Sequence, residues 1–132
     1  MNTLFEYTIR LADDSLILGH RMSEWCGHGP ILEEDIALTN IALDLVGQAT
    51  SLLAYAGEAE GKERDADDLA FLRFDREYKN ALLVEQPNGD FGMTMMRQFL
   101  FDAFRIGSNC RKIFERNKIP FETFLRMGNT IR

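Results

Sequence analysis

Residues 32–59, LEEDIALTNIALDLVGQATSLLAYAGEA, decide the fold that this sequence predicts. Glu33, Glu34 and Asp35 complement the positive end of a helix dipole, so a helix is expected to begin with them. The rest of the segment is apolar on two sides, and such a helix packs against more than one neighbour, so it is predicted to be central. One face holds Leu38, Ile41, Ala42, Leu45, Ala49, Leu52 and Ala56, and the second holds Leu43, Val46 and Leu53.

Two further long helices are expected, one before and one after this central segment. The first runs from Thr3 to Trp25 and ends at the Gly- and Pro-rich residues 26–30, which cannot continue a helix. The second runs from the candidate N-cap Asp90 to about Arg116. Leu4, Leu11, Leu18 and Trp25 form the stripe of the first helix, and Met96, Phe99, Ala103, Ile106, Cys110 and Ile113 form the predicted buried face of the second.

Three long helices in series predict an all-α bundle, formed by residues 1–132 as a single domain. Residues 57–68 are predicted to form a solvated loop, and residues 69–78 a short connecting helix. A bundle of this kind normally closes with a fourth long helix, but only a stub follows the third. We therefore expect a chain that is either truncated or completed by another subunit.

Composition and charge exclude several classes of function. A net charge of -6 and a pI near 4.9 argue against nucleic acid, whose phosphates need a basic face. The C-terminal stretch from residue 97 is locally basic. A run of charges is usually a solvated helix face, so we favour that interpretation over an anionic partner. No apolar run approaches the roughly 20 residues that span a bilayer, and no export signal is recognised. We therefore expect a cytoplasmic protein without a membrane partner, with Cys26 and Cys110 as reduced thiols.

Three short blocks stand out through their order and spacing along the chain. They are Trp25-Cys26-Gly27-His28, Leu43-Asp44-Leu45-Val46-Gly47-Gln48-Ala49 and Leu83-Val84-Glu85-Gln86-Pro87-Asn88-Gly89. With these blocks the chain resembles the C-subunit (PaaC) family of bacterial phenylacetyl-CoA oxygenases, the ring 1,2-epoxidases of aerobic phenylacetate degradation. The resemblance runs from Met1 to about Arg116, and residues 117–132 do not resemble the family's continuation, so we expect an N-terminal part or a shortened form.

The resemblance implies a ferritin-like up-down helical bundle without a complete fourth core helix and without a working metal centre. A ferritin-like di-iron site takes a Glu from each of two helices and a Glu-x-x-His pair from each of two others. Here Asp44-x-x-Gly47 stands at the place of such a pair, and Gly47 has no side chain to supply the nitrogen ligand. Asp102 is a further degenerate ligand position. The di-iron cofactor is then expected on a homologous catalytic subunit, the partner in a hetero-oligomer.

A polar row lies on the otherwise apolar central helix, and it allows two interpretations. Asn40, Asp44, Gln48 and Ser51 are spaced so that they share one side of a helix. We favour a hydrogen-bonded polar seam or subunit contact, because buried polar groups are normally paired. The alternative, compatible with the first, is the remnant of a lost metal site.

The function expected from this pattern is that of a non-catalytic structural subunit that stabilises the catalytic chain of the oxygenase. The two-sided central helix and the missing fourth helix both require apolar surface from a neighbour. The alternatives are a ferritin-like enzyme whose ligands are completed across a homodimer, and a self-associating helical fragment. Cys26 and His28 do not support zinc or nucleophilic chemistry, because further ligands and an orienting acid are missing near them.

Overall fold

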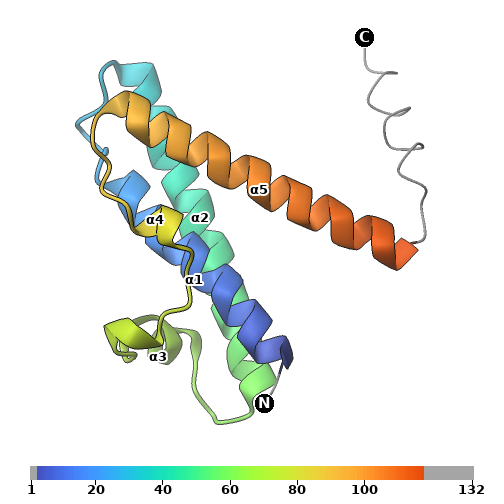
Figure 1. Cartoon of the computed structure of the whole chain (residues 1–132). Helices are drawn as coiled ribbons and strands as arrows, with labels where there is room; N and C mark the ends of the chain where they lie inside the picture. The colour runs from blue at the N-terminus through green and yellow to red at the C-terminus, as the bar shows by residue number, and fades with distance from the viewer. Residues whose placement is uncertain (1–2, 118–132) are drawn as a thin grey trace. The chain divides into compact units, whose positions relative to one another are not determined.

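The computed structural model describes residues 3–117, with side chains up to residue 108, and every regular element in this part of the chain is helical. The prediction of an all-α fold is therefore confirmed. The predictions for Cys110 and for the residues after Asn117 lie outside what the structure describes. The elements are α1 (Thr3–Ser23), α2 (Leu32–Glu60), α3 (Ala66–Phe71), a 3-10 turn (Asp75–Glu77), α4 (Leu82–Glu85) and α5 (Phe91–Asn117), as Figure 1 shows.

The chain separates into two compact units, the first ending at Thr94 and the second beginning at Met95. The first unit holds α1 to α4 together with the first turn of α5, and the second holds the rest of α5. One domain over residues 1–132 stays a prediction.

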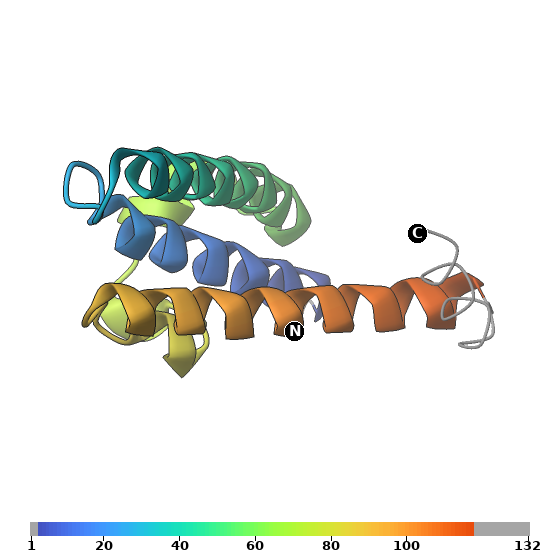
Figure 2. The same cartoon turned by 90° about the horizontal axis from the view of Figure 1, so that it is seen from above.

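The helices α1 and α2 form an antiparallel hairpin that contains the core of the first unit (Figure 1 and Figure 2). Near one end of the hairpin, Ile9 shares a buried cluster with Leu53. Near the other end the helices approach closely, because a Cβ placed on Gly19 would lie 3.0 Å from Val46 Cγ2. The buried cluster consists of Ile9, Ala12, Leu16, Ala49, Leu53, Ala56, Leu69 and Ala70.

The apolar sides of α2 differ in burial, and this corrects the prediction that both are buried. Leu38, Ala42 and Leu45 on the first predicted face are buried, as expected. On the second face only Leu53 is buried, whereas Leu43 is 66% exposed and Val46 is 36% exposed. The helix packs on α1 along one side, and no described element of the first unit covers the other.

The boundaries of the elements between α2 and α5 also differ from prediction. The central helix continues to Glu60, and Gly61 then ends it with a positive φ of 71° and an N–H that donates to the Gly57 carbonyl. The predicted loop is therefore shorter, and α3 begins one residue after Asp65, whose carboxylate caps the Asp68 N–H at 2.8 Å. The first helix ends at Ser23, two residues before the predicted Trp25, because the chain turns at the following Gly-rich run.

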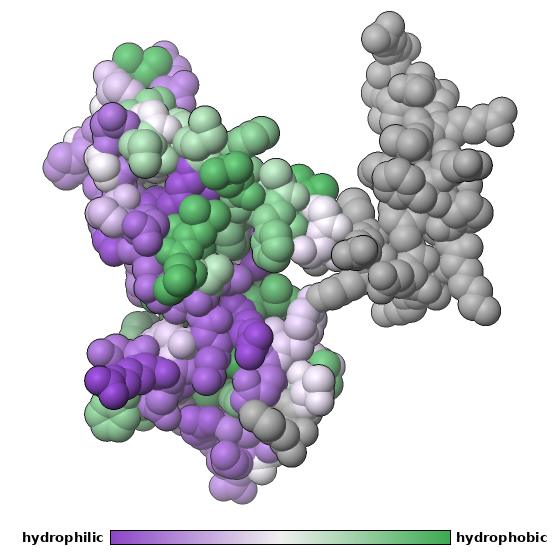
Figure 3. Space-filling model, in the orientation of Figure 1, coloured by the Kyte–Doolittle hydropathy of each residue, from purple (hydrophilic) through white to green (hydrophobic). Residues whose placement is uncertain are grey.

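In α5 the predicted start is confirmed and the predicted buried face is wrong. Asp90 Oδ1 accepts the Met93 N–H at 2.8 Å, which is the bond expected of an N-cap. Met96, Phe99 and Ile106, however, are exposed. Figure 3 shows apolar surface along α5 and hydrophilic surface around α3. The helical spacing of apolar residues correctly identified an apolar face of α5. The described residues of the second unit, however, do not bury this face.

Candidate functional site

The predicted polar row lies on the side of α2 that faces away from α1. Asn40, Asp44, Gln48 and Ser51 are all exposed. The one hydrogen bond found for them in the described chain is local, because Ser51 Oγ donates to the Gly47 carbonyl at 3.2 Å. In the described chain these four side chains do not bond to one another, and the interpretation as a hydrogen-bonded seam stays a prediction. The interpretation as a subunit contact stays a prediction.

The residues at the degenerate metal position do not fit a di-iron site. Gly47 is exposed, and a Cβ built on it would meet nothing within 4 Å. Asp102 belongs to the second unit, where both of its carboxylate oxygens accept from Gln98 Nε2 at 3.0 Å. His20 and His28 are exposed, and no cluster of three or more His, Cys, Asp or Glu suited to a metal occurs among the described residues. No reaction step through iron is derived for this chain.

Two of the three motif blocks are joined by hydrogen bonds at the end of the hairpin. Trp25 Nε1 donates to Thr94 Oγ1 at 3.1 Å, and that hydroxyl donates to the Asn88 carbonyl at 2.9 Å. The Asn88 amide in turn donates to the Arg21 carbonyl and to Glu24 Oε2, each at 2.8 Å. These motif residues therefore fasten the turn before α5 to the end of α1, which is a structural role.

Further motif residues act in the same junction. Arg21 Nη2 donates to the carbonyl of Glu85 at 3.0 Å, and Gly89 adopts a positive φ of 61° that glycine accommodates readily. Gln86 Nε2 donates to the Leu82 carbonyl at 3.2 Å. Pro87 follows in the irregular segment between α4 and α5. The end of α4 is thus held by local bonds and by α1.

The Cys26-Gly27-His28-Gly29 turn is closed by a carboxylate from the start of α2. Asp35 accepts the backbone N–H of Gly27 at 3.2 Å and that of Gly29 at 3.0 Å. The bonds from Gly29 and then Gly27 lower the pKa of Asp35 below its ordinary value of 3.8. His28 Nδ1 lies 3.1 Å from the Cys26 carbonyl, so neither side chain activates the other. The sequence indicated a dipole role for Asp35 and missed this closure.

Two buried carboxylates of α1, Asp13 and Asp14, were missed by sequence reasoning. Asp13 is fully buried, pairs with the guanidinium of Arg73 and accepts the Lys79 N–H at 2.8 Å. Asp14 accepts the Ala81 N–H at 2.7 Å. They hold the segment after α3 against α1. The signal that could have revealed them is a pair of carboxylates inside an apolar helix, which need buried partners.

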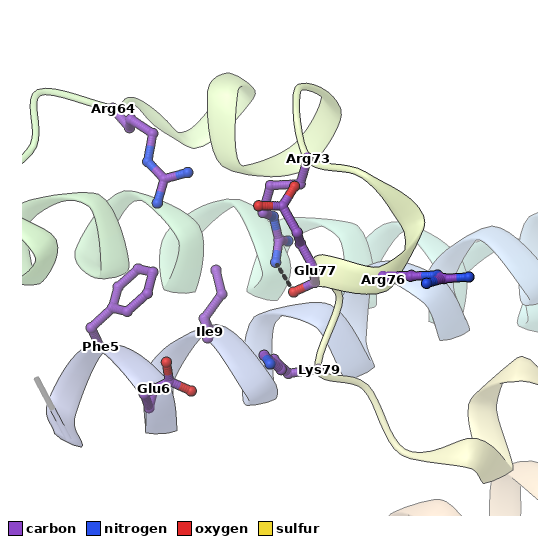
Figure 4. Close-up of a pocket in the computed structure, with 8 residues that line it drawn as sticks. All are labelled: Phe5, Glu6, Ile9, Arg64, Arg73, Arg76, Glu77 and Lys79. Carbon is purple, nitrogen blue, oxygen red and sulfur yellow. Dashed lines mark hydrogen bonds between the residues drawn. The ribbon is translucent and has the colours of Figure 1, made fainter. Parts of the chain in front are cut away.

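A cavity of about 240 Å³ lies beside this anchor and is shown in Figure 4. Two of its four cations pair with carboxylates: Arg73 binds Asp13, and Arg64 pairs with Glu60. Arg76 points away from the other labelled side chains in Figure 4. The lining shows no surplus of unpaired charge that would select an anion. It consists of Phe5, Glu6, Ile9, Arg64, Arg73, Arg76, Glu77 and Lys79.

A second hollow, of about 180 Å³, opens where the Cys26 turn meets the outward side of α2. Its walls are mainly apolar and include the exposed Leu43 and also Val46, which lies next to Gly19 of α1. An apolar cavity of roughly 150 Å³ admits a group the size of benzene, so this hollow can accept one apolar side chain. It is lined by Ser23, Cys26, Thr39, Ala42, Leu43 and Val46.

The length and hydropathy of α2 match those of a membrane-crossing helix, although the sequence pattern did not predict this. The most apolar window of Leu32–Glu60 has a mean hydropathy of 1.4, and 28% of it is buried. Core helices of proteins outside the membrane have the same length and hydropathy, so these two properties do not distinguish the two environments.

Comparison with known proteins places the three motif blocks in a family context. A family model described as "Phenylacetic acid catabolic protein" matches residues 1–112. Over 117 residues the chain is 51% identical to the C-subunit of the 1,2-phenylacetyl-CoA epoxidase of Escherichia coli (strain K12). The match covers 89% of this chain and 47% of that protein, so the chain spans about half the length of this relative. The expected resemblance and the ferritin-like class of the helical fold are confirmed.

Proposed function

Because this chain belongs to the phenylacetic acid catabolic protein family, we propose that it is a structural subunit of a phenylacetyl-CoA epoxidase acting in phenylacetate catabolism. In this proposal it performs no chemistry and pairs with the homologous catalytic subunit, which holds the di-iron cofactor. The complex works in the cytoplasm, without nucleic acid or membrane as a partner. The relative from Escherichia coli is named as one subunit of an epoxidase, which supports membership of a multi-subunit assembly.

The observation that carries the proposal is the uncovered side of α2. Leu43 is two-thirds exposed on a helix whose opposite side is tightly packed, and Ile36 is exposed as well. Exposed apolar surface that is continuous along a helix marks a protein contact more often than solvent-facing structure. A subunit that completes this surface would remove it from water.

The absence of a catalytic role is supported by the chemistry of the side chains at the degenerate site. Gly47 provides no ligand atom, and Asp44 on the same helix is exposed rather than directed at a buried centre. The motif residues Trp25 and Asn88 are engaged in structural hydrogen bonds. The geometry therefore supports a scaffold more directly than an enzyme.

Co-expression with the catalytic epoxidase subunit tests the proposal. We expect the two chains to co-purify and to elute as one species in size-exclusion chromatography, with iron present in the complex and absent from this chain purified alone. Two separate peaks would contradict the proposal. Around two irons for each chain, after reconstitution of this chain alone, would instead support the homodimeric enzyme.

A further inference from the structure

Asn88 is the only Asn in the sequence that is followed by Gly, and this pair lies in the turn between α4 and α5. An Asn-Gly pair is prone to deamidation, because Gly89 has no side chain that keeps its backbone nitrogen away from the Asn88 amide carbon. Gly89 is exposed and Asn88 is half-buried, so water reaches the pair. By contrast, Ala81 follows Asn80, and its methyl group hinders the same approach.

In the folded chain the side-chain amide of Asn88 is held in place. Its Nδ2 donates to the Arg21 carbonyl and to Glu24 Oε2, each at 2.8 Å. The Asn88 carbonyl accepts from the Thr94 hydroxyl at 2.9 Å, and Trp25 Nε1 donates to that hydroxyl at 3.1 Å. Deamidation expels Nδ2 as ammonia, so the two bonds that this nitrogen donates must break before it can leave.

We propose that Asn88 is a site of spontaneous deamidation, that the junction between α1 and the turn before α5 protects it, and that its reaction releases this junction. In the first step the Gly89 nitrogen forms a bond to Asn88 Cγ while the Cγ–Nδ2 bond breaks. The proton lost from the Gly89 N–H leaves with the ammonia. Water then opens the cyclic imide at either carbonyl and yields an aspartate or an isoaspartate, so the reaction consumes only water.

Neither product can make the contacts that Asn88 makes. Each product lacks the NH₂ group and carries a carboxylate, so the bonds to the Arg21 carbonyl and to Glu24 are lost. The new charge then lies near the Glu24 carboxylate, and like charges at this distance are unfavourable. The Arg21 guanidinium already donates to Glu24 and to the Glu85 carbonyl, so it is not free to neutralise the added charge. An isoaspartate also lengthens the backbone of the turn by one carbon.

Trp25 provides a signal for the state of the junction. It is the one Trp of the sequence, so the fluorescence of the chain at its wavelength comes from this residue. Its ring packs edge-on against Phe91 with 5.7 Å between the ring centroids, and its N–H donates to Thr94. Release of the junction should expose the indole to water and shift its emission to longer wavelength.

The first test follows deamidation of the full chain by peptide mass spectrometry, in guanidinium chloride and in buffer. In guanidinium chloride, Asn88 should react roughly tenfold or more faster than Asn80, and Gly89→Ala should remove this difference. In buffer, Asn88 should react at least about tenfold more slowly than in guanidinium chloride, because it reacts only when the junction opens locally. Equal rates for Asn88 and Asn80 in guanidinium chloride, or equal rates for Asn88 in the two solvents, would overturn the proposal.

A second test weakens the protection without changing the reacting pair. Glu24→Ala removes one acceptor of the Asn88 amide and should speed deamidation in buffer by roughly tenfold, which corresponds to a lost hydrogen bond to a charged group. Glu24→Gln is the matched control, because its amide oxygen can still accept, and its rate should lie between those of the wild type and Glu24→Ala. Circular dichroism verifies that both variants keep the fold. A wild-type rate in Glu24→Ala would contradict the protective role of the junction.

A third test examines the consequence of the reaction. Asn88→Asp reproduces one product, and it should shift the emission of Trp25 to longer wavelength, as should wild-type chain that has deamidated during storage. Asn88→Ala removes the same hydrogen bonds without adding a charge, so its shift should be smaller. In a Glu24→Gln background the shift caused by Asn88→Asp should shrink, because the repulsion is removed. Unchanged emission in both Asn88→Asp and the deamidated chain would show that the junction survives the reaction and would overturn the proposal.

Discussion

Aspartates occur on both helices of the hairpin, yet their surroundings differ completely. On α1, Asp13 is fully buried and paired with Arg73 and a backbone N–H. On α2, Asp44 is exposed on a side that no described element of its unit covers. A carboxylate in an apolar helix can therefore occur in two structural settings. It either binds another part of the same chain, as Asp13 does, or lies on a surface that its own unit leaves exposed, as Asp44 does.

The contrast extends from the aspartates to the two sides of the hairpin. The inner side is complete, with a buried cluster that includes Ala12, Ala49 and Leu53. On the outer side the apolar residues Leu43 and Ile36 are exposed. Matched substitutions at buried and exposed positions should therefore change the free energy of unfolding to different extents, and this makes the contrast testable.

The largest effect is expected from Asp13→Ala. Removal of the carboxylate leaves the buried Arg73 guanidinium unpaired, and breaking such a pair lowers the free energy of unfolding by about 3–5 kcal/mol. Urea denaturation measures the loss. Asp44→Ala is the matched control and should change stability by less than about 0.5 kcal/mol, as surface substitutions usually do.

A double variant isolates the unpaired charge as the cause. Asp13→Ala combined with Arg73→Met removes both charges, so it should be less destabilised than Asp13→Ala alone. Equal losses in the single and double variants would show that Asp13 acts through its bond to the Lys79 N–H rather than through Arg73. Comparable losses for Asp13→Ala and Asp44→Ala would abolish the contrast between the helices.

The next largest effect compares two leucines of α2 that differ in burial. Leu53 is 2% exposed and Leu43 is 66% exposed. Leu53→Ala should lower the free energy of unfolding by about 2–5 kcal/mol, because it leaves a cavity in the core. For the isolated chain, Leu43→Ala should change it by less than about 0.5 kcal/mol. A large loss from Leu43→Ala, measured on the isolated chain, would mean that its side of α2 is already covered.

Two glycines of α2 provide a smaller, backbone-level comparison. A Cβ on Gly57 would collide with the Arg64 carbonyl oxygen, so Gly57→Ala should destabilise the chain by about 1–3 kcal/mol through overpacking. A Cβ on Gly47 meets nothing, so Gly47→Ala should stabilise the helix by about 0.5–1 kcal/mol. Thermal unfolding followed by circular dichroism distinguishes the two signs. A shift of the same sign in both variants would contradict the assignment of the two sides.

The smallest effect concerns the C-terminal end of α2 and depends on pH. Hydrogen bonding from Arg64 lowers the pKa of Glu60 below its ordinary value of 4.5, and Lys62 acts in the same direction. A depressed folded-state pKa stabilises the fold above the unfolded value and loses this contribution as pH falls through the folded value. The stability difference between wild type and Glu60→Gln should therefore be constant near neutral pH and shrink below pH 4.5. In an Arg64→Gln background, the difference in stability that Glu60→Gln causes should be small at every pH.

Local patterns in the sequence were sufficient to predict the hairpin and the start of α5. The carboxylates before Ile36 predict a helix start, and the Gly-rich run after Trp25 predicts a helix end. The structure confirms both boundaries within a few residues, because α1 ends at Ser23 and α2 begins at Leu32. Asp90 was identified as an N-cap because a cap depends only on the three residues that follow it. Local chemistry acts over short separations, so a sequence displays it directly.

The covered and uncovered apolar sides could not be told apart from the sequence. Periodicity shows that Leu43 and Leu53 are apolar and lie at helical positions, but not which neighbour is present to bury them. The same reasoning failed for Phe99 on α5, which was predicted buried and is exposed. Burial depends on the set of chains that assemble, and this information lies partly outside the sequence.

The anchors of the first unit escaped prediction because their partners are remote. Asp13 and Arg73 are 60 residues apart, and Asp14 and Ala81 are 67 residues apart. No spacing rule links such positions. The motif residue Trp25 likewise meets Thr94 across 69 residues, so its block was recognised by resemblance while its structural role was not.

These remote bonds also bear on the order in which the chain folds. The α1–α2 hairpin joins neighbouring segments, whereas the segment from Arg73 to Asn88 is hydrogen-bonded to α1 between residues that lie 60 to 67 positions apart. Closing longer loops loses more chain entropy, so this segment should dock on a hairpin that has already formed. The backbone amides of this segment, Lys79 and Ala81 among them, should then exchange with deuterium when the segment detaches locally. The amides of Leu45 and Ala49 should exchange only when the whole unit unfolds.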